Sequence, residues 1–189
     1  MKRAFIIHGW TTTNKQDWLP WAAKEIASKG YQVTAPLMPD TDYPIIHDWL
    51  AKMVEIVGTA QPSDIFIGHS LGCQAILRYL DSQPANTKVD KLILVAGGQI
   101  LSPEALPLPE DEIVFGPWRD TPINFAKIKI MANQVIVIFS DNDPWVILEK
   151  NAPIYERELG AKIIVQKGKG HFMKDLGGVT KLPVILDYI

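Results

Sequence analysis

The stretch that decides the fold is "SDIFIGHSLGCQAIL", Ser63–Leu77. Its first half contains Ile65-Phe66-Ile67, a run typical of a buried strand, and its second half places apolar residues at helical spacing. Between the halves lies Gly68-His69-Ser70-Leu71-Gly72, which matches G-x-S-x-G, a pattern that places a serine on a sharp strand-to-helix turn. We therefore expect Ser70 to be an exposed nucleophile in a strained backbone conformation. The alternative is a loop that contains a serine by chance.

Strand and helix patterns alternate along the rest of the chain. Strands are predicted at Ala4–His8, Gln32–Leu37, Asp64–Gly68, Lys91–Gly97, Gln134–Ser140 and Lys162–Gln166. Helices are predicted at Asp17–Lys29, Pro44–Thr59, Leu71–Asp81, Phe125–Met131, Pro144–Leu159 and Val179–Tyr188. Most strand candidates are continuous apolar runs, as expected for parallel strands buried on both faces. The sequence predicts an α/β fold, doubly wound, with a mostly parallel six-stranded sheet and helices on both faces, in a single domain over 1–189.

One stretch, Gly97–Pro122, lacks a regular pattern and is rich in proline. Because each proline interrupts or ends a helix, we expect an ordered rim there and no lid domain. The rim would carry Trp118 and Arg119, with Glu110-Asp111-Glu112 facing water.

The bulk composition excludes several classes of function. A net charge of −2 without a basic cluster gives no electrostatic reason to expect nucleic acid as a partner. A single cysteine excludes an internal disulfide framework. No apolar run approaches the length of a membrane span, and the residues after Met1 do not read as a secretory signal. We therefore expect a cytoplasmic protein with no membrane or nucleic-acid partner.

A serine nucleophile needs a base, and four histidines are available. His171 follows the last predicted strand in a glycine-rich loop, and such loops line the ligand crevice of an open α/β sheet. His69 should point away from the serine, His8 belongs to the turn after the first strand, and His47 is expected on a helix surface. His171 is therefore the expected base.

The acid should follow another strand, and Ser140–Pro144 directly follows the strand ending at Ser140. We favour Asp143 for the triad and Asp141 for the loop, although a turn followed by a helix cap explains both aspartates as well. The order serine, aspartate, histidine is that of the α/β-hydrolases. The two aspartates lack histidines at metal-ligand spacing, so neither a metal nor a cofactor is expected.

Two backbone N–H groups should stabilise the oxyanion, and two side chains are candidates for contact with substrate. The N–H of Leu71 lies at the start of the helix after the serine, and Trp10 follows the His8-Gly9 turn. Trp118 and Trp145 are expected to line the acyl or leaving-group pocket.

Together these motifs resemble the α/β-hydrolases. The stretch Phe115–Val146, which leads through a tryptophan and a short helix into the acid strand, is similar to the small YdeN-like serine hydrolases. That family includes the retinoblastoma-binding serine hydrolase. The resemblance covers nearly the whole chain and implies that Ser70, Asp143 and His171 form the triad. Thr11–Asn14 departs from the pattern, because it replaces any longer glycine run after the first strand.

The expected function is that of an esterase-like serine hydrolase. Its substrate would be a small-molecule ester, thioester or amide, cleaved through an acyl-enzyme. Two alternatives remain at this point: a non-catalytic binding or scaffolding protein on the same fold, and an acyltransferase. No protein partner is indicated.

Overall fold

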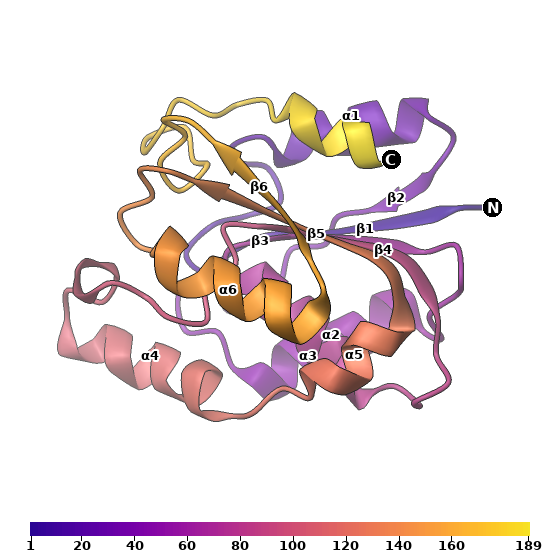
Figure 1. The fold of residues 1–189 in the computed structure, drawn as a ribbon, viewed down its shortest axis with the longest axis horizontal. Coiled ribbons are helices and arrows are strands. Elements are labelled where there is room, and N and C mark those ends of the chain that lie inside the picture. The colour runs from indigo at the N-terminus through magenta and orange to yellow at the C-terminus, as the bar shows by residue number, and fades with distance from the viewer.

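The computed structural model describes residues 1–189 and contains one six-stranded sheet (Figure 1). The strand order is β2-β1-β3-β4-β5-β6, and every neighbouring pair is parallel. The strands are β1 (Arg3–Ile7), β2 (Gln32–Thr34), β3 (Ile65–His69), β4 (Val89–Val95), β5 (Ala132–Ser140) and β6 (Lys162–Gln166). The predicted α/β fold class is confirmed, and the sheet is wholly rather than mostly parallel.

Helices cover both faces of this sheet. They are α1 (Leu19–Ser28), α2 (Ile46–Val57), α3 (Leu71–Ser82), α4 (Pro109–Asp120), α5 (Phe125–Met131) and α6 (Leu148–Leu159), with 3₁₀ turns η1 (Pro103–Ala105) and η2 (Pro183–Tyr188). In Figure 1, α1 and η2 lie on one face, whereas α2, α3, α5 and α6 lie on the other. None of the helices combines the length and apolar character that crossing a bilayer requires.

The core consists of two apolar layers, one on each side of the sheet. In β3, Phe66 packs into the layer beneath α2 and α3, whereas Ile65 and Ile67 pack into the layer beneath α1 and η2. All three side chains are completely buried. Burial on both faces explains why the strands appear in the sequence as continuous apolar runs rather than as alternating patterns.

The stretch Gly97–Pro122 is more regular than its prolines suggest. It contains η1 and the twelve-residue helix α4, and neither of these elements is predicted from the sequence. Pro109 occupies the first turn of α4, where a backbone N–H has no helical acceptor to lose. Pro117 lies near the end of α4, so few of the helix's hydrogen bonds depend on it. At the C-terminus, the helix expected over Val179–Tyr188 is the shorter η2.

The connections place the carboxyl ends of β1 and β3 side by side. β1 lies between β2 and β3, so the chain moves outward in opposite directions from this point. In open α/β sheets, the crevice beyond the strand ends at such a switch point is where ligands bind. The turns after β1 and β3 carry Gly9 and Ser70, respectively.

Candidate active site

Ser70 lies on the sharp turn between β3 and α3, with φ 52° and ψ −122°. This conformation is strained for a residue with a side chain. The flanking glycines make the turn possible. A Cβ atom on Gly72 would lie 2.3 Å from the Ile7 carbonyl oxygen, and one on Gly68 would lie 2.8 Å from the Cys73 Cα atom. Any larger residue at either position would push α3 away from the sheet.

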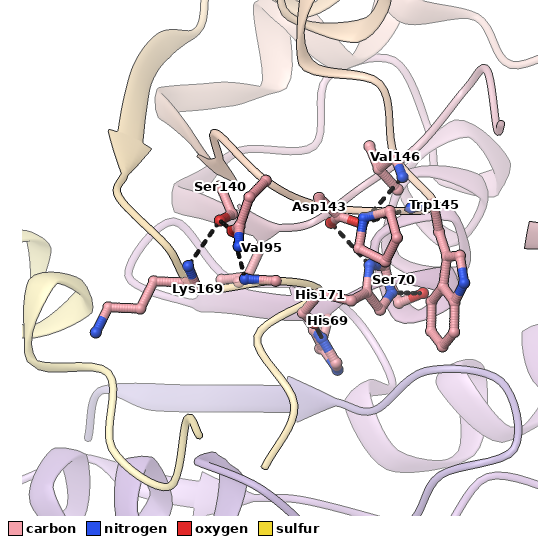
Figure 2. A network of polar contacts seen from close by, with 12 residues as sticks. His69, Ser70, Val95, Ser140, Asp143, Trp145, Val146, Lys169 and His171 are labelled. Carbon is pink, nitrogen blue, oxygen red and sulfur yellow. Dashed lines mark hydrogen bonds and ion pairs between the residues drawn. The ribbon is translucent and has the colours of Figure 1, made fainter. Parts of the chain in front are cut away.

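Three of the predicted site residues form one hydrogen-bonded chain (Figure 2). His171 Nε2 lies 2.9 Å from Ser70 Oγ, and His171 Nδ1 lies 2.8 Å from Asp143 Oδ2. The side chains of His171 and Asp143 are 3% and 1% exposed, which leaves little room for water to compete for these bonds. With Nδ1–H donating to the carboxylate, Nε2 can accept the serine proton.

The two aspartates after β5 have separate roles. Asp143 uses Oδ2 for His171, while its Oδ1 accepts the backbone N–H groups of Trp145 and Val146. Asp143 therefore makes both the turn bonds and the histidine bond that the sequence left as alternatives. Asp141 Oδ1 instead accepts the N–H of Gly168 at 2.7 Å.

His69, next to the serine, binds the backbone of His171, the expected base. His69 Nε2 lies 2.9 Å from the carbonyl oxygen of His171, and the Nε2–H group donates a hydrogen bond to that oxygen. Complete burial, reinforced by the nearby charge of His171, lowers the pKa of His69 to about 3. His69 is therefore neutral at ordinary pH. Sequence reasoning predicted that this side chain turns away from Ser70 but missed its contact with His171.

The two residues expected to donate to the oxyanion, Leu71 and Trp10, both border the recess beside Ser70. Leu71 is the first residue of α3, so its N–H has no acceptor within the helix. The Trp10 N–H has no hydrogen-bond acceptor in the protein. The Thr12 hydroxyl accepts the Gly9 N–H at 3.1 Å, and His8 Nδ1 lies 2.8 Å from the Gly9 carbonyl. The side chains of Thr12 and His8 thus hold this turn, in which Thr11–Asn14 replaces a longer glycine run.

A cavity of about 240 Å³ opens above Ser70, and a recess of about 40 Å³ lies beside it. Trp10, Ser70 and Leu101 border both spaces. The recess is otherwise lined by Leu71, Gln74, Gly98, Phe115 and Val146. Both spaces meet at the Ser70 side chain, so a bound molecule could place different groups on the two sides of its reacting atom.

Of the two tryptophans expected in the pocket, one lines it. Trp145 borders the cavity, and its ring centroid lies 4.7 Å from that of His171. Trp118 is 1% exposed and packs edge-on against Trp49, with its Nε1–H donating to the Pro44 carbonyl. The expectation for Trp118 is wrong, because α4 turns this ring into the core.

The segment before and within α4 supplies one wall of the cavity. Leu101, Ala105 and Pro107 contribute apolar surface, and Glu104 and Asp111 contribute carboxylates. No lysine or arginine lines the cavity. No sequence pattern indicates this wall, and Asp111 lines the cavity although the acidic run Glu110–Glu112 predicts a residue that faces water.

Comparison with known proteins identifies the family to which the chain belongs. The family model described as serine hydrolase matches residues 4–189, and the chain belongs to this family. The curated protein YdeN of Bacillus subtilis, named as a hydrolase, is 31% identical over 188 residues, covering 100% of this chain and 94% of YdeN.

Solved structures show the same architecture. The crystal structure of the B. subtilis ydeN gene product superimposes with a TM-score of 0.88 at 28% identity, covering 100% of this chain and 96% of that one. Est1E from Butyrivibrio proteoclasticus, solved with ferulic acid bound, has a TM-score of 0.69 at 15% identity, covering 92% and 82% of the two chains. At that identity, Est1E supports the α/β-hydrolase fold alone.

Proposed function

We propose that this protein hydrolyses small acyl esters, with thioesters and amides as chemically related substrates, through an acyl-enzyme on Ser70. The observation that carries the proposal is the hydrogen-bonded chain Asp143–His171–Ser70, which ends at the floor of an open cavity. Membership of the serine hydrolase family supports hydrolysis as the class of reaction.

Each step follows from the positions of these groups. As Ser70 Oγ attacks the substrate carbonyl, His171 Nε2 takes the serine proton, and Asp143 stabilises the resulting imidazolium. The backbone N–H groups of Leu71 and Trp10 donate to the oxyanion that develops. His171 then gives its proton to the leaving group. In the second half of the cycle, His171 takes a proton from the water that attacks the acyl-enzyme, and it returns this proton to Ser70 Oγ as the carboxylic acid leaves.

The sizes of the two spaces favour a short acyl group. The recess of about 40 Å³ is bordered by apolar residues, among them Phe115 and Val146, and adjoins Leu71. We assign it to the acyl chain, and we assign the larger cavity beside Trp145 to the leaving group. A short aliphatic chain would fill such a recess, whereas a long one would require the surrounding core to move.

The charge of the larger cavity favours neutral or cationic leaving groups. Glu104 and Asp111 are the only carboxylates that line it, and no basic side chain balances them. Hydrogen bonds to its own backbone N–H and to Ser102 lower the pKa of Glu104, so this carboxyl group is ionised at neutral pH. An anionic leaving group would meet two like charges near its binding position.

The test compares initial rates with p-nitrophenyl acetate for the wild type and for Ser70→Ala, whose folding is checked by circular dichroism. We expect turnover by the wild type and none above background by Ser70→Ala. Equal rates for the two proteins, or no turnover of any short ester, thioester or amide by the folded wild type, would contradict the proposal. Adding alcohols or amines and searching for transfer products separates hydrolysis from acyl transfer.

A further inference from the structure

Beyond the ends of β5 and β6, three consecutive side chains bind three consecutive backbone N–H groups. Ser140 Oγ accepts the N–H of Lys169 at 2.9 Å, as Figure 2 shows. Asp141 Oδ1 accepts the N–H of Gly168 at 2.7 Å, and Asn142 Oδ1 accepts the N–H of Gly170 at 2.8 Å. Asp143, the next residue, binds the His171 ring. Four successive residues that begin at the last residue of β5 thus bind four successive residues of the segment that follows β6.

These bonds begin where the sheet's own pairing ends. The register of β5 and β6 closes at Ser140 opposite Gln166, with a last backbone bond from the Asp141 N–H to the Gln166 carbonyl. Gly168 then adopts φ +68°, and the chain leaves the strand direction. Its next N–H groups can no longer reach the β5 backbone, so side chains from the β5 end replace the missing acceptors.

The three side chains are also linked to one another. The Ser140 hydroxyl donates to Asn142 Oδ1 at 2.8 Å, so it acts as donor and acceptor at once. Ser140 is 1% exposed, and Gly170, whose N–H meets Asn142, is buried as well. The Asp141 bond lies at the surface. Asn142 itself is exposed, but the bonds that Ser140 and Asn142 accept are partly buried. Loss of either acceptor would therefore leave a shielded N–H unpaired, whereas water could replace Asp141.

On its other side, the histidine loop packs closely against the chain at Leu176. A Cβ atom on Gly170, which has φ +52°, would overlap the Leu176 carbonyl oxygen at 1.3 Å. His69 holds the carbonyl group of His171. The backbone around His171 is thus enclosed by the Ser140–Asn142 side chains, by the chain at Leu176 and by His69.

We propose that Ser140, Asp141 and Asn142 are positioning residues, which act through the 168–170 backbone to hold the His171 ring between Asp143 and Ser70. The proposal rests on the proposed function for its kinetic consequence, although the geometry it describes can be measured without substrate. Ser140 and Asn142 carry most of the effect. Asp141 contributes least, because its bond is exposed to water.

The kinetic test uses Asn142→Ala, Ser140→Ala and the conservative Asn142→Asp, which keeps an oxygen acceptor for the Gly170 N–H. A misplacement of about 1 Å can cost roughly 10²-fold in rate, so we expect both alanine variants to lower kcat by about 10- to 100-fold with KM unchanged. Asn142→Asp should recover most of the kcat that Asn142→Ala loses.

The matched control is Asn124→Ala. Asn124 also accepts a backbone N–H through its side-chain oxygen, from Lys127 at 3.0 Å, but it caps α5 before β5 begins. Its loss should lower the melting temperature without changing kcat or the pH profile of kcat/KM. If Asn142→Ala behaves in the same way as Asn124→Ala, the residues are structural and the proposal is wrong.

A second readout does not depend on turnover. In ¹⁵N-histidine-labelled protein, the His171 Nδ1 proton that is shared with Asp143 should give a far-downfield resonance that is protected from exchange. We expect this resonance to broaden or disappear in Ser140→Ala and Asn142→Ala and to persist in Asn124→Ala. An unchanged resonance in both Ser140→Ala and Asn142→Ala would overturn the proposal. A changed resonance in a protein without any hydrolytic activity would support it while contradicting the proposed function.

Discussion

Gly9 packs directly against Ser70: a Cβ atom on Gly9 would lie 2.9 Å from the Ser70 Cβ atom. This contact links the turn after β1 to the nucleophile, and the next residue, Trp10, borders the recess beside Ser70. We predict that Gly9→Ala displaces this N–H and lowers kcat by about 10²–10³-fold, the usual cost of losing one oxyanion donor, with a smaller change in KM.

The control for this prediction is Gly116→Ala in α4. A Cβ atom there meets its nearest neighbours at 3.7 Å, which is an ordinary contact, and alanine favours a helix over glycine. Gly116→Ala should therefore keep both activity and stability. If Gly9→Ala hydrolyses p-nitrophenyl acetate as fast as Gly116→Ala, the turn after β1 does not supply the second donor.

The two aspartates after β5 should respond differently to replacement, because Asp143 orients the His171 ring whereas Asp141 binds the backbone of its loop. Asp143→Asn keeps Oδ1 for the Trp145 and Val146 N–H groups, so the fold should hold. An amide facing His171 favours the wrong tautomer, and the corresponding change in a serine protease lowers kcat on the order of 10⁴-fold. Asp141→Asn keeps the acceptor for Gly168 and should leave kcat close to that of the wild type. The reverse ranking of kcat would assign the orienting role to Asp141.

Much of this architecture could be predicted from local sequence patterns. Buried parallel strands give continuous apolar runs, and the strand-to-helix turn at Ser70 needs glycine at Gly68 and Gly72 for steric reasons that hold in any α/β sheet. The spacing of the loops then brings His171 and Asp143 to the same sheet edge, because every strand is parallel.

What could not be predicted depends on contacts between distant segments. Helix α4 was missed because proline is a poor helix former in general, although it is tolerated in a first turn, where Pro109 lies. Without α4, the sequence predicts Trp118 in the pocket. Its actual position against Trp49 depends on how α4 packs on the core. The bond of His69 to the His171 carbonyl joins residues 102 positions apart and has no local signature.

The size of the recess beside Ser70 predicts a preference for short acyl chains. Val146 is 2% exposed and borders the recess. Val146→Ala should enlarge it and raise the butyrate-to-acetate ratio of kcat/KM by about tenfold, the scale of one or two methylenes in an apolar pocket. Val89→Ala removes the same atoms from a buried site at the start of β4 and should leave the ratio unchanged. Equal ratios in the two variants would place the acyl chain elsewhere.

Stability should fall in acid because of two buried neutral histidines. Burial lowers the pKa of His69 to about 3 and also lowers the pKa of His8. Below the unfolded-state pKa of about 6.5, the unfolded chain binds protons that the folded chain does not, so stability decreases as pH falls from there toward the folded pKa. Each such histidine contributes a slope of up to about 1.4 kcal/mol per pH unit in that window and none above it.

The variant that tests this effect is His69→Gln, which keeps an amide donor for the His171 carbonyl and does not titrate. Urea unfolding at several pH values should show a shallower acid decline in stability for His69→Gln than for the wild type, with little pH dependence of the difference above the unfolded-state pKa. Parallel stability curves across the acid range would show that folding does not lower the pKa of His69.

The central claim is that Ser70 is a nucleophile activated by His171, and active-site labelling tests it most directly. The wild type, Ser70→Ala and His171→Ala are treated with a fluorophosphonate, followed by intact-mass and peptide mass spectrometry. We predict one phosphonyl adduct per wild-type chain, located on Ser70, with none on Ser70→Ala and greatly slowed labelling of His171→Ala. A folded wild type that stays unlabelled, or that carries its adduct on another residue, would contradict the account.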